Sequence, residues 1–368
     1  MDKQVILAKA GSGKTYYICN TLDPQKKNLV LAFTHENINN ILSELVKTYG
    51  KIPNLTTVMT FDAFKYRLLL KPYETSVLSN FDCTINRGKG ITMINPPEKT
   101  CKKNNRIVNN PAYITQDKIG HYLTKTGYYY CSRLSELLMK SKIGKEKLIV
   151  HAAKQINLFF DYVYIDEFQD YRMNDYEIMI NISKNIDNIL LVGDYYQHSV
   201  SGTNNTGKPF LNKSNPVSYA AFVKSLQKNS FVVDDKSLVY SRRCSNEICE
   251  FIRKKLGIEI YGNSERKGKI IFVKDVDKAK EIIQDDNIIK LVYKNASTYP
   301  FKVVNWSYSK GDTMKMICVI LTKTTDFIMD GSQLIQNISP ITRNKLYVAL
   351  TRSISDVYVI SSSLFKQI

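Results

Sequence analysis

The chain has 368 residues, enough for two or three domains that each bury a core of their own. Hydrophobic residues make up 43% and charged residues 23%, which is typical of a soluble globular protein. No apolar run approaches the ~18 residues of a membrane span. Lysine and arginine (52) outnumber the acidic residues (34), and the formal charge of +18 attracts polyanions. Nucleic acid is the favoured partner and an anionic membrane surface is the alternative, whereas a lysine-rich codon bias would explain the charge without any partner.

The start of the chain and its cysteines indicate the cell compartment. The opening residues, Met1 to Gln4, do not have the pattern of a signal peptide. Seven cysteines are scattered without a C-x-x-C pair, as in a protein with reduced thiols. We therefore expect a cytoplasmic protein that uses no membrane.

Short apolar segments alternate with amphipathic segments along the first part of the chain. The pattern predicts strands at 5–7, 28–33 and 56–59 and helices at 15–22, 36–49 and 61–70. It resumes with strands at 162–165 and 188–192 and a helix at 174–183. Continuous apolar strands separated by helices are typical of a parallel sheet covered on both faces, so the predicted fold class is α/β.

The alternation fades between residues 71 and 148, where glycines, prolines and a basic run precede one helical stretch at 132–142. We interpret this segment as an insertion that interrupts the first domain. A second α/β set is predicted to begin around Phe231. It has a helix at 246–255 and strands at 237–240, 269–273, 288–292, 316–321 and 357–361.

A glycine-rich turn follows the first predicted strand. Gly11 and Gly13 let the backbone point its N–H groups at phosphate oxygens, and a helix is predicted to begin directly behind them. Lys14 would reach the β- and γ-phosphates, and the Thr15 hydroxyl would be a ligand for Mg²⁺. The strict pattern has glycine where this chain has Ala8. ATP and Mg²⁺ are the predicted cofactors, and the predicted cofactor-binding residues are Ala10, Gly11, Ser12, Gly13, Lys14 and Thr15.

Two carboxylates follow the strand predicted at 162–165. Ligands of open α/β sheets bind at the carboxyl ends of the strands. Asp166 is therefore predicted to hold Mg²⁺ through water, and Glu167 to orient and deprotonate the attacking water. After the next strand, the Gln197 amide is predicted to sense the γ-phosphate.

In this order, the motifs resemble those of the UvrD/Rep-type superfamily 1 helicases. Residues 32–35 are similar to the strand-end segment that contacts the nucleic-acid backbone in that family, and residues 60–64 to its Thr-Phe-His-x-Phe segment. Residues 241–245 are similar to Asn-Tyr-Arg-Ser, 309–313 to the Ser-Lys-Gly segment, and 346–352 to Tyr-Val-Ala-x-Thr-Arg. The insertion and residues 257–305 are not covered by the resemblance.

The resemblance implies two RecA-like P-loop NTPase domains with parallel sheets, ATP between them and a small insertion in the first. The first domain would comprise 1–70 and 149–230, the inserted accessory subdomain 71–148, and the second domain 231–368. Arg243 and Arg352 would act as arginine fingers and complete the catalytic set with Glu167 and Gln197. Arg242 stands where the family has a tyrosine that stacks on the base, and a guanidinium can also stack on a purine.

The same resemblance implies a path for nucleic acid. The residues expected on it are Thr34, His35, Thr60, Phe61, Trp306, Tyr308 and Lys310, although Trp306 and Tyr308 are equally expected to be packing aromatics. The family's adenine-reading segment before the phosphate loop is expected to be absent, as is its aromatic-Arg-Gly segment after the glutamine.

We therefore expect an ATPase coupled to helicase or translocase activity on single-stranded DNA, moving 3′ to 5′. One alternative is a nucleotide-dependent regulatory subunit that gates a partner nuclease, as in a defence or mobile-element system. The other is an RNA-directed helicase. Stimulation of ATP hydrolysis by single strands separates the first alternative from the other two functions.

Overall fold

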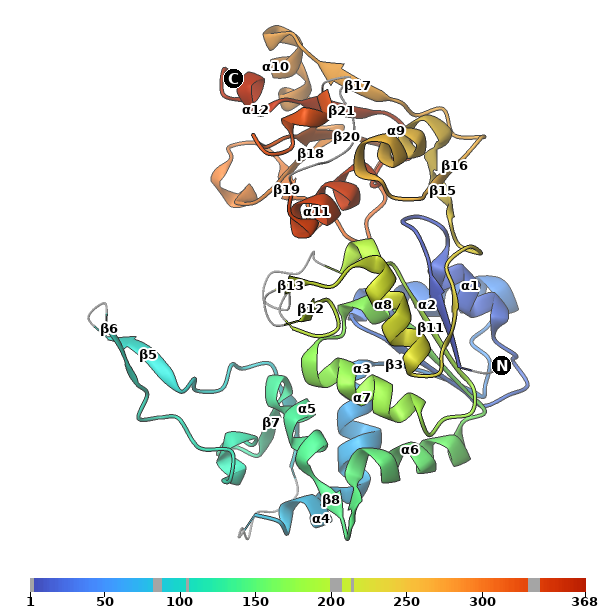
Figure 1. The fold of residues 1–368 in the computed structure, drawn as a ribbon, viewed down its shortest axis with the longest axis vertical. Helices are drawn as coiled ribbons and strands as arrows, with labels where there is room; N and C mark the ends of the chain where they lie inside the picture. The colour runs from blue at the N-terminus through green and yellow to red at the C-terminus, as the bar shows by residue number, and fades with distance from the viewer. Residues whose placement is uncertain (1–2, 82–87, 104–105, 199–206, 213–214, 330–337) are drawn as a thin grey trace.

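The computed structural model describes residues 3–81, 88–103, 106–198, 207–212, 215–329 and 338–368. Two parallel sheets lie one above the other along the long axis, each with helices on both faces, and a smaller group of elements lies beside the first (Figure 1). The predicted fold class, α/β with parallel sheets of the RecA-like kind, is confirmed.

The first sheet has the order β14-β1-β11-β10-β2-β3, and all neighbouring strands are parallel. Its strands are β1 Gln4–Leu7, β2 Asn28–Ala32, β3 Thr56–Thr60, β10 Tyr162–Asp166, β11 Ile189–Gly193 and β14 Val232–Asp234. Successive side chains point to opposite faces, so Val5 and Ile6 pack into different cores. Helices α1 Lys14–Thr21 and α2 His35–Tyr49 cover the Ile6 face, while α6 Leu148–Phe159, α7 Met173–Ser183 and α8 Tyr219–Lys228 cover the other.

Local hydrogen bonds and backbone conformation determine where helix α2 begins and ends. The Thr34 side chain accepts a hydrogen bond from the Asn37 N–H, which satisfies a donor that the first helical turn leaves free. At the other end, Gly50 has a φ of 77°, a left-handed conformation that stops the helix. Thr34 is thereby held at the carboxyl end of β2, next to the cleft between the two sheets.

The predicted start of the second α/β set is wrong by one strand. Residues 232–234 form β14, which pairs in parallel with Gln4–Ile6 and so belongs to the first sheet. The strand predicted at 237–240 is instead β15, Tyr240–Ser245. The second domain therefore begins after β14, because this short edge strand completes the first sheet by pairing with backbone far away in the sequence. The other proposed domain limits stay predictions.

The second sheet has the order β17-β21-β20-β18-β19 and is also parallel. Its strands are β17 Ile270–Val273, β18 Ile288–Val292, β19 Val303–Asn305, β20 Met316–Ile320 and β21 Val357–Ile360. Helices α10 Val276–Gln284 and α12 Ser362–Phe365 pack on one face, and α9 Asn246–Leu256 and α11 Pro340–Leu350 on the other. Strand β15 pairs with β16 Tyr261–Asn263, and this pair lies at the end of the second domain that faces the first sheet.

The segment between 71 and 148 is built from short elements. The helix predicted at 61–70 is α3 Phe61–Phe64 followed by a π-helix, Lys65–Leu70, and the one predicted at 132–142 is α5 Cys131–Lys140. Strands β5 Thr100–Lys103 and β6 Arg106–Asn109 form an antiparallel hairpin that projects from the body (Figure 1). We call residues 99–103 and 106–109 the basic arm, because it carries Lys99, Lys102, Lys103 and Arg106 and no acidic residue.

Candidate active site

The phosphate loop lies between β1 and α1, at the carboxyl edge of the first sheet. Gly11 and Gly13 have φ angles of 71° and 88°, which side chains other than glycine rarely allow. A Cβ atom on Gly11 would also lie 2.6 Å from Ser241 Oγ and 2.8 Å from Arg243 Cβ. Gly11 is thus needed both for the turn and for the close approach of the second domain.

The predicted metal ligands face each other across this edge. The Thr15 hydroxyl lies 3.3 Å from the Asp166 carboxylate, at the end of β10. Asp166 is 1% exposed, and burial together with the adjacent Glu167 raises its pKa. A buried carboxylate with a hydroxyl beside it suits a hard cation such as Mg²⁺, which completes its shell with water and phosphate oxygens.

Glu167, the predicted base, lies between two lysines from different domains. Its Oε1 is 3.3 Å from Lys14 Nζ of α1, and its Oε2 is 3.3 Å from Lys310 Nζ of the second domain. Lys310 also pairs with Asp170 at 2.6 Å. Burial by itself would raise the pKa of Glu167, but the two ammonium groups outweigh burial and lower it. Glu167 is therefore held as a carboxylate in a site to which both domains contribute.

Asp194 is a second buried carboxylate, directly after β11. It accepts hydrogen bonds from the Gln197 amide at 2.9 Å and from the Tyr347 hydroxyl of α11 at 3.0 Å. Tyr347 in turn accepts a hydrogen bond from the Ala10 N–H of the phosphate loop at 2.7 Å. The predicted sensor Gln197 is thus bonded to a carboxylate that also contacts the second domain.

The three predicted arginines lie at different places. Arg243 lies against Gly11 of the phosphate loop, and its guanidinium donates to the Thr351 carbonyl at 3.1 Å. The backbone N–H of Arg242 donates to the Gly11 carbonyl at 2.8 Å. The Arg242 guanidinium lies 4.2 Å from the centre of the Tyr16 ring. Arg352 is buried and donates to backbone carbonyls of its own domain, including Val348 at 2.9 Å. In this conformation Arg352 is a packing residue and does not contact the phosphate loop.

Two of the residues expected to contact nucleic acid are buried. Trp306 is 0% exposed, with its indole N–H donating to the Leu291 carbonyl at 3.0 Å, and Phe61 packs 4.4 Å from the Tyr171 ring. Each ring fills the core of its own domain, so Trp306 follows the alternative expectation of a packing aromatic, and Phe61 does not offer its ring for stacking in this conformation. Thr60 is half-buried and caps α3 by accepting from the Ala63 N–H.

The other expected residues lie around the interdomain cleft. Thr34 and Lys310 line a cavity of about 220 Å³ together with Glu36, Asn37, Glu167, Asp170, Tyr308 and Gly311. Tyr308 is 69% exposed, and His35 is exposed at the start of α2. Lys310, which was expected to contact nucleic acid, pairs in this structure with Glu167 and Asp170.

A pocket of about 520 Å³ lies beside the phosphate loop. Its lining includes Ser12 of the loop, Arg242 and Tyr240 of β15, and Asn246 at the start of α9. These side chains offer a cation, an exposed aromatic ring and an amide next to the place where phosphates would lie, so the pocket is suited to the sugar and base of a nucleotide.

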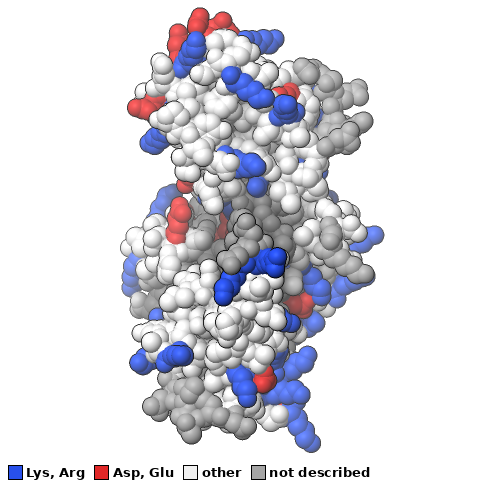
Figure 2. Space-filling model, turned by 90° about the vertical axis from the view of Figure 1, so that its left-hand side faces the viewer, with Lys and Arg blue, Asp and Glu red and all other residues white. Residues whose placement is uncertain are grey.

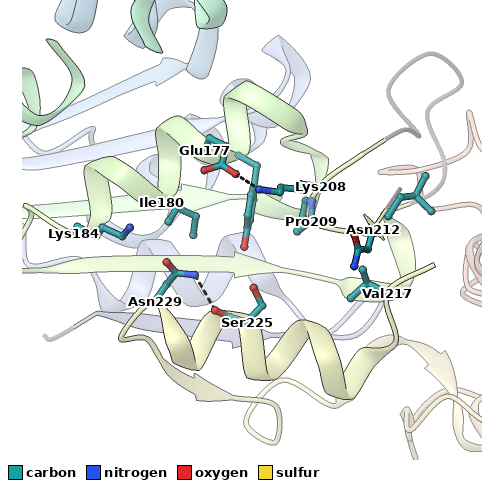
Figure 3. A pocket seen from close by; sticks show the side chains of 11 residues that line it. Glu177, Ile180, Lys184, Lys208, Pro209, Asn212, Val217, Ser225 and Asn229 are labelled. Carbon is teal, nitrogen blue, oxygen red and sulfur yellow. Dashed lines mark hydrogen bonds and ion pairs between the residues drawn. The ribbon is translucent and has the colours of Figure 1, made fainter. Parts of the chain in front are cut away.

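Another pocket, of about 400 Å³, lies between α7 and α8 (Figure 3). It is lined by Glu177 and Ile180 of α7, Ser225 of α8 and the intervening segment that carries Lys208. The Lys208 ammonium pairs with Glu177 at 3.0 Å. None of the predicted site residues lines this pocket, so it is separate from the candidate active site.

Two site residues were missed by the sequence analysis. Gln169 is buried between Glu167 and β11, and Tyr347 connects α11 to the phosphate loop. Gln169 follows the predicted pair Asp166 and Glu167 closely, and Tyr347 lies in the segment 346–352 of the resemblance, so polar residues within these motifs were the available signal.

The comparisons with known proteins show the family of the chain. A protein-family profile described as AAA domain matches residues 2–203, more than half of the chain. No curated protein sequence matches the chain. Among the described helices, none combines the length and the apolar character that crossing a membrane requires.

Solved viral helicase structures are similar at low identity. An arterivirus nonstructural protein 10 (helicase) in complex with DNA is 11% identical with a TM-score of 0.47, over 98% of this chain and 61% of that one. A crystal structure of arterivirus nonstructural protein 10 (helicase) is 12% identical with a TM-score of 0.45, over 99% of this chain and 62% of that one. A crystal structure of PRRSV nsp10 (helicase) is 12% identical with a TM-score of 0.23, over 97% of this chain and 54% of that one. This chain therefore matches less than two thirds of the length of each.

Proposed function

We propose that this chain, which belongs to the AAA-domain family, is an NTP-hydrolysing motor of the superfamily 1 helicase kind that moves along single-stranded nucleic acid. The more specific proposal is ATP as the fuel, DNA as the track and 3′ to 5′ movement. One observation carries the motor function itself: Glu167 lies between Lys14 of the first domain and Lys310 of the second. Hydrolysis at Glu167 would then respond to how the two domains are placed.

The phosphates of the nucleotide would lie on the loop from Gly11 to Thr15. The N–H groups at the start of α1 and the Lys14 ammonium supply positive charge for them. Thr15 and Asp166 would hold Mg²⁺, which supplies charge neutralisation for the β- and γ-phosphates when bound. Lys14 would exchange its contact with Glu167 for phosphate oxygens, and Glu167 would be left to accept a proton from the attacking water.

The second domain would stabilise the transition state through Arg243. Its backbone lies against Gly11, and its guanidinium would leave the Thr351 carbonyl to bind the γ-phosphate. Arg352 remains the second proposed finger. It would have to leave the Val348 carbonyl and its other backbone partners when nucleotide binds.

The strand of nucleic acid would cross the cleft between the two sheets. Thr34 and Tyr308 line the cavity there from opposite domains, and Lys310 lies at its inner end beside Glu167. Tyr308 is exposed enough to stack on a base, which is worth about 1–3 kcal/mol. A strand bound there would contact both domains and so would sense their movement.

Steady-state hydrolysis of ATP, measured alone and with single-stranded DNA or RNA, tests the proposal. We expect stimulation by single-stranded DNA and loss of turnover in the Glu167→Gln variant. Greater stimulation by RNA would overturn DNA as the track. Hydrolysis that ignores both nucleic acids would contradict the motor function and favour a nucleotide-dependent switch.

A further inference from the structure

We propose that Gln169 is the positioning residue that orients the Glu167 carboxylate toward the attacking water. We also propose that the Gln169 side chain can take this position only because residue 193 is a glycine. This inference rests on the proposed hydrolysis at Glu167. It assigns a role to two residues outside the predicted site and links Glu167 to the second domain.

The hydrogen bonds of Gln169 fix both ends of its side-chain amide. The Oε1 atom accepts from the Asp194 N–H at 3.0 Å, and the Nε2 atom donates to Glu167 Oε2. A backbone N–H can only donate, so the oxygen of the amide must face Asp194 and its NH₂ group must face Glu167. The Gln169 side chain is 0% exposed, so no water competes for these contacts.

Glycine at 193 makes this arrangement possible. A Cβ atom on Gly193 would lie 2.1 Å from Gln169 Oε1 and 2.7 Å from Phe168 Cδ1. Gly193 is not among the described glycines with positive φ, so its backbone conformation does not require glycine. The close approach of the Gln169 side chain does require it.

Gln169 is also the contact of Glu167 that would persist through a catalytic cycle. Lys14 would turn to the phosphates, and Lys310 belongs to the second domain and would move with it. Gln169 comes from the same short helical turn as Glu167 and is anchored on β11 of the same sheet. It can therefore hold the carboxylate after both lysines have left.

The anchor of Gln169 extends to the second domain. Asp194, whose N–H holds Gln169, accepts through its carboxylate from the Tyr347 hydroxyl of α11. A shift of α11 would move Asp194, and through Gln169 it would change the aim of Glu167. Domain movement and the orientation of the base are thereby connected by three hydrogen bonds in series.

The test compares the Gln169→Glu variant with the parent chain in full length. Glutamate keeps the size of the side chain and can still accept from the Asp194 N–H, but it cannot donate to Glu167 and repels it. We expect kcat for ATP with single-stranded DNA to fall roughly 10- to 100-fold, because a misaimed base loses its near-attack geometry. Nucleotide affinity, measured by fluorescence with a labelled ATP analogue, should stay within about twofold, because Gln169 acts on the base rather than on phosphate binding.

The Gly193→Ala variant breaks the same contact from the other side. Its kcat should fall to a similar extent, and the double variant should be no slower than the slower single one, because both changes remove one interaction. Asn28→Ala is the matched control. It removes a buried amide of β2 that donates to the Asp23 and Lys26 carbonyls, so it should lower the unfolding temperature without lowering kcat.

Separate outcomes overturn the inference and the proposed function. A parent chain that does not hydrolyse ATP contradicts both. A parent that hydrolyses ATP while Gln169→Glu keeps its kcat overturns the positioning role alone, as do losses from Gln169→Glu and Gly193→Ala that multiply in the double variant.

Discussion

The hydroxyl of Tyr347 accepts a 2.7 Å hydrogen bond from the Ala10 N–H, so a helix of the second domain reaches into the phosphate loop of the first. The same hydroxyl donates to the buried Asp194 carboxylate at 3.0 Å. Tyr347 therefore satisfies two buried polar groups that belong to the other domain. Both hydrogen bonds form only when the two domains lie together as they do in this structure.

Tyr347→Phe should destabilise the chain without nucleotide by about 1–3 kcal/mol, because it leaves the Ala10 N–H and one contact of Asp194 unpaired. It should also lower kcat, since the phosphate loop loses its contact with α11. Tyr49→Phe is the control, because that hydroxyl donates to the Cys19 and Leu22 carbonyls away from the loop. Thermal unfolding and steady-state hydrolysis check both. A kcat for Tyr347→Phe equal to that of Tyr49→Phe would contradict a coupling role.

Lys14→Ala and Glu167→Gln should stop hydrolysis by different routes. Losing Lys14 removes the charge that binds the phosphates, whereas Glu167→Gln should leave ATP bound and lower kcat by about 100-fold or more. Equilibrium binding of a labelled ATP analogue separates the two. Parental turnover in Glu167→Gln would show that another group is the base.

Arg243→Ala should lower kcat by about 10³-fold with little change in ATP affinity, because a finger acts on transition-state charge. Arg352→Ala should also lower the unfolding temperature, because the Arg352 guanidinium bonds buried carbonyls of its own domain. Kinetics and thermal unfolding on both variants measure the difference. If Arg352→Ala lost stability but kept its kcat, Arg352 would be a packing residue only.

Figure 2 faces the side from which the basic arm projects and shows lysine and arginine side chains near its centre. Each phosphate neutralised on duplex DNA contributes about −0.9 to the log–log salt slope. Replacing Lys102, Lys103 and Arg106 by serine should therefore flatten the slope for tailed duplexes by up to about 2.7. The same change at Lys274, Lys278 and Lys280, beside or on α10 at the far end, is the control. Equal slopes for both triple variants would show that the arm does not contact the phosphates.

His198 predicts how stability depends on pH. Its ring stacks 3.9 Å from Phe210, and burial lowers its pKa to about 3. Because the folded-state pKa lies below the unfolded value, the contribution to stability is complete above pH ~6.5 and is lost as the pH falls towards 3. The parent should lose up to about 2 kcal/mol between pH 6.5 and 5, and His198→Phe should lose less. Denaturant unfolding at the two pH values measures this, and identical losses would contradict the assignment.

Local patterns were enough to predict most strands of the two parallel sheets, the phosphate loop and the acidic pair. Gly11, Gly13 and Asp166 act through the backbone and strand ends next to them, so a short segment contains the whole signal. Trp306 and Phe61 could not be placed in the same way, because their burial depends on strands and loops distant in the sequence.

The links between the motifs were also beyond the sequence. Gln169 meets Asp194 and Tyr347 meets Ala10 only after the chain has folded, and no spacing rule connects residues so far apart. The short strand β14 was missed for the same reason, because its pairing with β1 defines it more than its own three residues do.

Movement along a single strand tests the central claim most directly. The protein is first bound to single-stranded DNA of increasing length that carries a fluorophore at its 5′ end. The complex is then mixed with ATP, and stopped flow records the time until the protein reaches the 5′ end. The account predicts a lag that grows linearly with strand length in the parent chain and is absent in Glu167→Gln. A lag independent of length, with ATP hydrolysed at the normal rate, would contradict it.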